Sequence, residues 1–310
     1  MTNARLEKLM ATSRPWITDG GLETAMVFQE GIDLPMFASF HALESARGRS
    51  AMTAYFDQYI ALAKEVGTGF VLDTATWRSG AYWAPRVVRS EAEMERVTRD
   101  AVDFAIALRA QHESETTPVV IAGIVGPAGD GYDPNKQMWS AADAEKEHMP
   151  QVRWLAESGV DLIVTATFTH TGEAIGLVNA ARAQHIPVVV GFTLETDGRL
   201  PTGQALDEAI AETDSATQSA PLYYMVNCAH PTHLPAGITQ VSRIGGLRAN
   251  ASCMSHAELD SAEELDQGDP EEFGALYAPL VSNMARVHVV GGCCGTDIRH
   301  IRSIARHILN

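Results

Sequence analysis

Residues 287–296 read Val-His-Val-Val-Gly-Gly-Cys-Cys-Gly-Thr and join a short apolar run to two adjacent thiols. The apolar run is typical of a buried strand, and the glycines on both sides of Cys293 and Cys294 allow a sharp turn and close approach to a ligand. Cys228 also follows an apolar run. Three of the four cysteines therefore follow predicted strands, which is where an α/β barrel holds its chemistry.

Similar apolar runs recur along the whole chain. They predict strands at 14–21, 69–73, 119–123, 160–165, 187–192, 223–227, 287–291 and, more weakly, 240–249. Apolar residues at helical spacing predict helices at 50–66, 91–111, 141–158, 172–184 and 204–217. Buried strands that alternate with helices predict a parallel sheet, and this number in a chain of 310 residues fits a single-domain (β/α)8 TIM barrel over residues 1–310. A doubly wound open sheet is the alternative.

The composition narrows the class of partner. With 39 acidic and 23 basic residues the net charge is −16, which disfavours nucleic acid or an anionic membrane and favours a small-molecule substrate. The first ten residues do not resemble a signal peptide, so we expect a cytoplasmic protein. The sequence leaves the oligomeric state open, a homo-oligomer included. The acidic stretch at 258–272 is interpreted as a solvated loop and the start of a helix.

Cysteines in a reducing compartment are rarely joined as structural disulfides, which leaves metal binding, catalysis or packing. We interpret Cys253 as a packing residue. Cys228, Cys293 and Cys294 predict a catalytic zinc site with three thiolate ligands and one open position. Such a site is a weak Lewis acid, and it is better suited to holding a fourth sulfur as a reactive thiolate. The alternative is that these cysteines are simply small buried side chains.

Four motifs, taken in order, resemble those of the homocysteine S-methyltransferase family. They are Asp19-Gly20-Gly21, Gly126-Pro127, Asn227-Cys228 and the Gly-Gly-Cys-Cys-Gly-Thr segment at 291–296. The resemblance implies a TIM barrel in which Cys228, Cys293 and Cys294 bind Zn²⁺. It implies an S-methyltransferase that moves a methyl group from a sulfonium or betaine donor to the metal-bound thiolate of homocysteine, as in methionine biosynthesis. No catalytic side chain beyond that thiolate is required, because the protein mainly aligns the reacting atoms.

Recognition of the thiol acceptor is where this chain departs from the family. Family members usually carry Glu-Thr after the fourth strand, as a second carboxylate for the acceptor amine, whereas this chain has Ala166 followed by Thr167. A different thiol acceptor is therefore an alternative to homocysteine. Glu195, Asp197 or Asp73 is a candidate to replace the missing carboxylate. We assign substrate binding to Asp19, which matches the family position for the acceptor amine, and to Gly20, Gly21, Thr167, Glu195, Asn227 and Trp77.

Trp77 follows the second predicted strand, and an indole face there could attract an onium methyl donor; packing is the alternative. His230 and His233 are expected to support the site or a loop rather than to bind metal. Two other functions stay open: a zinc hydrolase on the same barrel, which the thiolate-rich ligand set disfavours, and a non-catalytic binding protein.

Overall fold

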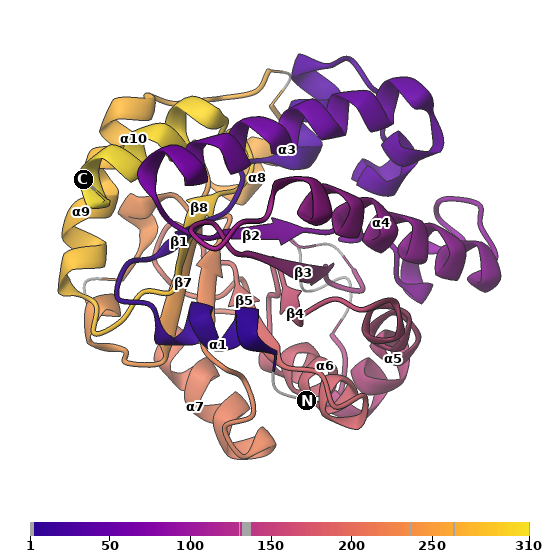
Figure 1. The fold of residues 1–310 in the computed structure, drawn as a ribbon. Helices are drawn as coiled ribbons and strands as arrows, with labels where there is room; N and C mark the ends of the chain where they lie inside the picture. Colours follow the sequence, from indigo (N-terminus) through magenta and orange to yellow (C-terminus); the bar gives the residue numbers. More distant parts are fainter. Residues whose placement is uncertain (1–2, 130, 132–137, 236, 263, 310) are drawn as a thin grey trace.

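The computed structural model describes residues 3–129, 131, 138–235, 237–262 and 264–309. Its parallel strands form a closed barrel in sequence order, with β8 paired to β1 (Figure 1). The strands are β1 (Trp16–Ile17), β2 (Phe70–Asp73), β3 (Val119–Val125), β4 (Leu162–Thr165), β5 (Val188–Phe192), β6 (Tyr224–Asn227), β7 (Ile244–Ala249) and β8 (Val289–Gly292). The predicted (β/α)8 barrel is confirmed, and the open doubly wound sheet is excluded.

Most helices surround the barrel and cover the outward faces of its strands, whereas the first helix lies across the amino end of the barrel (Figure 1). The helices are α1 (Ala4–Ala11), α2 (Leu22–Thr24), α3 (Ala46–Val66), α4 (Glu91–His112), α5 (Ala141–Ser158), α6 (Thr171–Ala183), α7 (Leu206–Thr217), α8 (His256–Asp260), α9 (Pro270–Asn283) and α10 (Ile298–Ile308). Local signals fix several of their ends. Ser90 and Glu93 form a capping box at the start of α4, and Gly67 ends α3 in the left-handed conformation, as its position in the sequence indicates.

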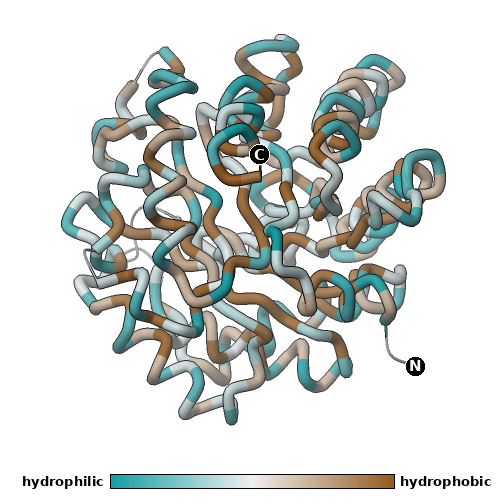
Figure 2. Tube along the Cα trace, turned by 60° about the vertical axis from the view of Figure 1, so that its left-hand side comes forward, coloured by the Kyte–Doolittle hydropathy of each residue, from teal (hydrophilic) through white to brown (hydrophobic). Residues whose placement is uncertain are grey.

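Two apolar layers stabilise the barrel. The outward side chains of the strands pack against the surrounding helices, while an inner cluster fills the barrel itself. In that inner cluster Leu6 and Leu9 of α1 pack with inward side chains such as Trp16 and Val120. Figure 2 shows hydrophobic segments concentrated in the central strands. The amino end of the barrel is therefore filled by packing, and the carboxyl end remains for chemistry.

Several boundaries differ from the sequence prediction. The strand predicted at 14–21 is only two residues long, because its pairing with β2 ends at Ile17. Thr18 and Asp19 keep backbone hydrogen bonds to β8. The weak strand predicted at 240–249 begins at Ile244, after a short 3-10 helix at Ile238–Gln240. Helix α7 begins at Leu206 rather than at residue 204.

The connection between α2 and α3 was not predicted to have regular structure. It contains a π-helix at Ala25–Gln29 and 3-10 helices at Pro35–Phe37 and Ser39–Glu44. Met36 and Phe37 have positive φ angles of 55° and 56° and are among the exposed large apolar residues. In the part of the chain that the structure describes, no helix has the length and apolar character needed to cross a membrane.

Candidate metal and substrate site

A cavity of about 730 Å³ lies at the carboxyl end of the barrel, which is a volume typical of small-molecule sites. Residues at or after the carboxyl ends of seven strands line it, although they are scattered over most of the sequence. They include Asp19 after β1, Asp73 and Thr74 at the end of β2, Gly129 after β3, Ala166 and Thr167 after β4, Asn227 and Cys228 at the end of β6, Arg248 and Asn250 around the end of β7, and Cys293 and Cys294 after β8.

The three predicted metal ligands lie together in this cavity. The sulfur atoms of Cys228, Cys293 and Cys294 all lie within 4.8 Å of one another. Hydrogen bonding with Cys228, together with burial, raises the pKa of Cys293 to about 12. Soft thiolates at this spacing fit a thiophilic cation such as zinc. Cys253 is exposed, so its interpretation as a packing residue is wrong.

The backbone around the thiols is unusually close and partly strained. A Cβ atom on Gly21 would lie 2.7 Å from the carbonyl oxygen of Cys293, so only glycine allows this approach. Gly295, with a φ of 77°, turns the chain directly after the two cysteines. Cys228 and Thr167 also adopt the left-handed region, with φ angles of 56° and 63°, and each such residue costs about 1–3 kcal/mol. Both Cys228 and Thr167 line the cavity.

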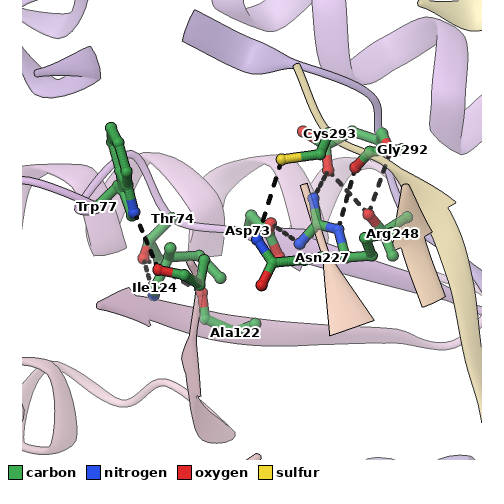
Figure 3. A network of polar contacts seen from close by, with 12 residues as sticks. Asp73, Thr74, Trp77, Ala122, Ile124, Asn227, Arg248, Gly292 and Cys293 are labelled. Carbon is green, nitrogen blue, oxygen red and sulfur yellow. Dashed lines mark hydrogen bonds and ion pairs between the residues drawn. The ribbon is translucent and has the colours of Figure 1, made fainter. Parts of the chain in front are cut away.

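Two asparagine amides face the sulfur atoms. The side-chain nitrogen of Asn227 lies 4.0 Å from the sulfur of Cys293 (Figure 3). The side-chain nitrogen of Asn250 lies 3.7 Å from the sulfur of Cys228. The oxygen of the Asn227 amide accepts a hydrogen bond of 2.9 Å from the backbone N–H of Thr167, which fixes its orientation. Amide donors aimed at sulfur favour the thiolate form and orient metal ligands.

Beside the thiols, Arg248 lies between two carboxylates (Figure 3). Its guanidinium donates to Oδ1 of Asp19 at 2.8 Å and to Oδ2 of Asp73. Asp19 is further held by Thr18 and by the hydroxyl of Tyr55, at 2.9 and 3.1 Å. One guanidinium is therefore shared by two buried carboxylates. Burial raises the pKa of Asp73 to about 7, although the charge of Arg248 opposes that rise.

Six of the seven residues assigned to substrate binding line the cavity: Asp19, Gly20, Gly21, Trp77, Thr167 and Asn227. Glu195 lies outside the lining. Its carboxylate is 2.8 Å from Nδ1 of His256, whose Nε2 lies 3.4 Å from the carbonyl oxygen of Cys228. Glu195 thus helps to hold the backbone of Cys228 through His256. Asp197 is exposed and accepts a hydrogen bond from the backbone of Arg199 in a turn.

His230 and His233 also lie outside the cavity lining. His230 contacts Thr232 within its own loop, and Nε2 of His233 is 3.0 Å from the carbonyl oxygen of Cys253. Both histidines therefore make loop contacts, in keeping with the supporting roles expected for them.

Trp77 lies at the cavity wall and donates its indole N–H to the carbonyl oxygen of Ala166 at 3.3 Å. The guanidinium of Arg78 stacks on both tryptophans of this region, 4.5 Å from the ring centre of Trp77 and 4.1 Å from that of Trp83. Trp83 is buried and donates to the carbonyl oxygen of Pro127. The aromatic surface is thus able to hold a cation, and Arg78 is the cation that contacts it here.

Sequence reasoning missed Arg248, Asn250, Tyr55 and Glu23, all of which contribute to or surround the site. Arg248 carried a usable signal, because it is one of two charged residues, with Arg243, in the predicted strand segment 240–249. A charge in a buried strand requires a partner of opposite sign, which points to Asp19 and Asp73. The other three occupy ordinary positions in the sequence and carried no comparable signal.

The fold and the site together define a class: a closed parallel barrel whose mouth gathers three thiols beside a buried ion-pair cluster. The sequence profile of the homocysteine S-methyltransferase family matches residues 16–308. The chain therefore belongs to the homocysteine S-methyltransferase family.

Individual proteins agree with this membership. The chain is 26% identical over 223 residues to homocysteine S-methyltransferase 3 of Arabidopsis thaliana, a match that covers 68% of this chain and 62% of that protein. The matched region thus spans less than two thirds of that relative. In structure, the chain resembles the homocysteine methyltransferase MmuM of Escherichia coli. The oxidised form gives a TM-score of 0.77 at 18% identity, covering 98% of this chain and 99% of MmuM. The metallated form gives a TM-score of 0.75 at 17% identity, covering 97% of this chain and 99% of MmuM.

Proposed function

We propose that this protein is a zinc-dependent S-methyltransferase that methylates a thiol, with homocysteine as the acceptor and a sulfonium or betaine as the donor. The observation that carries the proposal is the group of three sulfur atoms within 4.8 Å of one another in a cavity of about 730 Å³. Membership of the homocysteine S-methyltransferase family supports the same activity, and so does the likeness to a methyltransferase that has a metallated form.

Cys228, Cys293 and Cys294 are the residues that would hold the metal. Zinc at three thiolates supplies, when bound, a fourth position at which an acceptor thiol loses its proton near neutral pH. The chain's own groups prepare that position. Asn227 and Asn250 direct amide N–H groups toward two of the sulfur atoms, and the left-handed backbone of Cys228 sets the direction of its side chain.

The chemical step is a displacement at carbon. The acceptor sulfur supplies an electron pair to the methyl carbon, and the bond from that carbon to the donor's sulfur or nitrogen breaks, with its electron pair staying on the leaving group. A cationic donor thereby becomes neutral, so no proton has to move to the leaving group. The protein's task is to hold sulfur, methyl and leaving group in line and to exclude water from the cavity.

The acidic lining of the cavity supports cationic ligands. Asp19 and Asp73 share one arginine, and Glu23 adds a further carboxylate. An onium donor and the ammonium group of an amino-acid thiol both suit such a surface. Asp19, with Gly20 and Gly21 beside it, and Thr167 and Asn227 form the acceptor side in this proposal, while Trp77 faces the donor.

One observation favours a second acceptor. Ala166 places only a methyl group in the cavity where family members usually carry the glutamate that binds the acceptor amine. A thiol with a differently placed amine, or with none, is therefore the alternative substrate for the same chemistry.

The test is a methyl-transfer assay on zinc-loaded protein, with homocysteine and either S-methylmethionine or glycine betaine. Methionine formation that depends on the metal supports the proposal. A metal-loaded protein that methylates another thiol but not homocysteine supports the second acceptor. Bound metal without methylation of any thiol supports the non-catalytic binding protein, and hydrolysis of an ester or amide without methyl transfer supports the hydrolase.

A further inference from the structure

Position 166 lacks the carboxylate, so the cavity must recognise an acceptor amine elsewhere or not at all. Carboxylates that line the cavity are Asp19, Glu23, Asp73, Glu264 and Asp266. Asp266 lies on the connection before α9 and is engaged by the hydroxyl of Ser252 at 2.6 Å and by the backbone N–H of Gly268. Glu264 is exposed at the rim. The three carboxylates that remain, Asp19, Glu23 and Asp73, all lie close to the ends of β1 and β2.

The oxygens of Asp19 already accept hydrogen bonds from several side chains of the protein. They accept from Arg248, Thr18 and Tyr55, so three donors already surround this carboxylate. Asp73 is different. It is 8% exposed, its Oδ2 accepts from Arg248, and its Oδ1 has no hydrogen-bond partner in the described structure. A buried carboxylate oxygen without a donor is costly, and a bound donor from the ligand would relieve that cost.

Glu23 is the second candidate, and unlike Asp73 it has no cation beside it among the described residues. Among the residues that the structure describes it forms no ion pair, and it lies at the cavity surface in α2. Its backbone is anchored against the metal-ligand segment on both sides: Gly21 packs on Cys293, and the hydroxyl of Thr24 accepts from the backbone N–H of Gly295 at 3.3 Å. The acceptor sulfur and this carboxylate are therefore brought to the same part of the cavity.

The electrostatics of these groups agree with an ammonium site. Burial raises the pKa of Glu23 to about 7, and the nearby charges of Cys293 and Asp19 add to the rise. The charge of Glu23 in turn contributes to the raised pKa of Asp73. Carboxylates that raise one another's pKa form a region of negative potential, which a cation between them would stabilise.

We propose that Glu23 and the unpartnered Oδ1 of Asp73 form the ammonium site for an amino-acid thiol, in place of the carboxylate missing at position 166. This assignment rests on the proposed function for the identity of the acceptor. It moves acceptor recognition from the end of β4 to the ends of β1 and β2, and it makes Glu23 a residue that determines specificity. The acceptor class is then a thiol that carries a protonated amine.

The experiment compares two thiols that differ in the amine alone: L-homocysteine and 4-sulfanylbutanoate. Calorimetry measures their binding to the zinc-loaded protein under reducing conditions, in the parent, in Glu23→Gln and in Asp73→Asn. Glu264→Gln is the matched control, because it makes the same chemical change at an exposed rim position. Thermal melts establish that each variant is folded, and Glu23→Gln alone decides the matter if Asp73→Asn does not fold.

The parent is expected to bind homocysteine roughly 10–100-fold more tightly than 4-sulfanylbutanoate, the scale of a hydrogen-bonded charge pair. Glu23→Gln should bring the two thiols to within about threefold by weakening homocysteine only, while Glu264→Gln keeps the preference. A parent without preference, or a Glu23→Gln variant that retains it, would overturn the assignment. Preferential binding without methyl transfer in the same samples would contradict the proposed function and leave the ammonium site standing. Failure to bind either thiol would contradict both.

Discussion

The thiol side of the cavity mouth, at the ends of β6 and β8, differs from the acceptor side, at the ends of β2 and β4. On the thiol side, three sulfur atoms lie close together, two amides face them, and the backbone of Cys228 is strained. On the acceptor side, Ala166 offers a methyl group, while Asp73 and Arg248 form a buried cluster with an unpartnered oxygen. The comparison teaches that the sulfur cluster and the polar groups across the cavity come from different strands, so that a variant can change one side and leave the other in place.

The largest effect on stability is expected at the ion-pair cluster. Arg248→Met would leave Asp19 and Asp73 buried without their shared cation, at a cost of about 3–5 kcal/mol in the free energy of unfolding. Chemical denaturation of parent and variant measures this cost. A loss below about 1 kcal/mol would mean that the cluster is not balanced by Arg248 as described.

On the thiol side, Asn227→Ala removes both the amide that faces Cys293 and the acceptor for the backbone of Thr167. Loss of such a supporting group typically lowers metal affinity by roughly 10–100-fold. Competition with a chelator measures the affinity. Asn283→Ala serves as the control, because this amide lies at the end of α9 and bonds only within its own helix. Equal zinc affinity in the parent and in Asn227→Ala would show that Asn227 does not support metal binding.

On the acceptor side, a carboxylate placed at the end of β4 should restore recognition of the acceptor amine. Ala166→Glu introduced into the Glu23→Gln variant is expected to recover roughly tenfold in homocysteine binding, because it restores a carboxylate to the cavity. Calorimetry with homocysteine and 4-sulfanylbutanoate checks that the recovery depends on the amine. A recovery for both thiols alike would point to a change of cavity shape instead.

A smaller effect is expected at the donor wall. Trp77→Leu removes an aromatic face and should raise the KM for an onium donor by about 3–10-fold, with zinc content and the KM for the acceptor unchanged. Steady-state kinetics with each substrate varied in turn separates the two constants. Lost zinc or a large fall in melting temperature would show that Trp77 serves packing, as Trp83 does by its burial.

Much of this site was predictable because its main signals are local in sequence. Adjacent thiols between glycines after an apolar run indicated Cys293 and Cys294, and the apolar run before Cys228 placed the third thiol at the same rim. The alternation of strands and helices indicated the barrel, which the closed sheet confirms. Strand ends were less accurate, because pairing with neighbours rather than local composition decides where β1 and β7 begin.

Other parts of the site depend on contacts between distant residues. Glu195 follows a strand, as a cavity residue would, but His256, which comes 61 residues later, engages its carboxylate outside the cavity lining. Glu23 reads as an ordinary residue after a glycine pair, and its place beside the thiols results from the approach of Gly21 to Cys293. Such close contacts form only when the barrel closes, and no local sequence pattern indicates them.

The most direct test of the central claim is the zinc content per chain by elemental analysis under reducing conditions. The parent, Cys293→Ser and Cys253→Ser are compared, the last as a control because Cys253 is exposed and apart from the three-sulfur group. The account predicts about one zinc per chain in the parent and in Cys253→Ser, and a nearly complete loss in Cys293→Ser. Folded parent protein that takes up no zinc, or Cys293→Ser that binds it as well as the parent, would contradict the account.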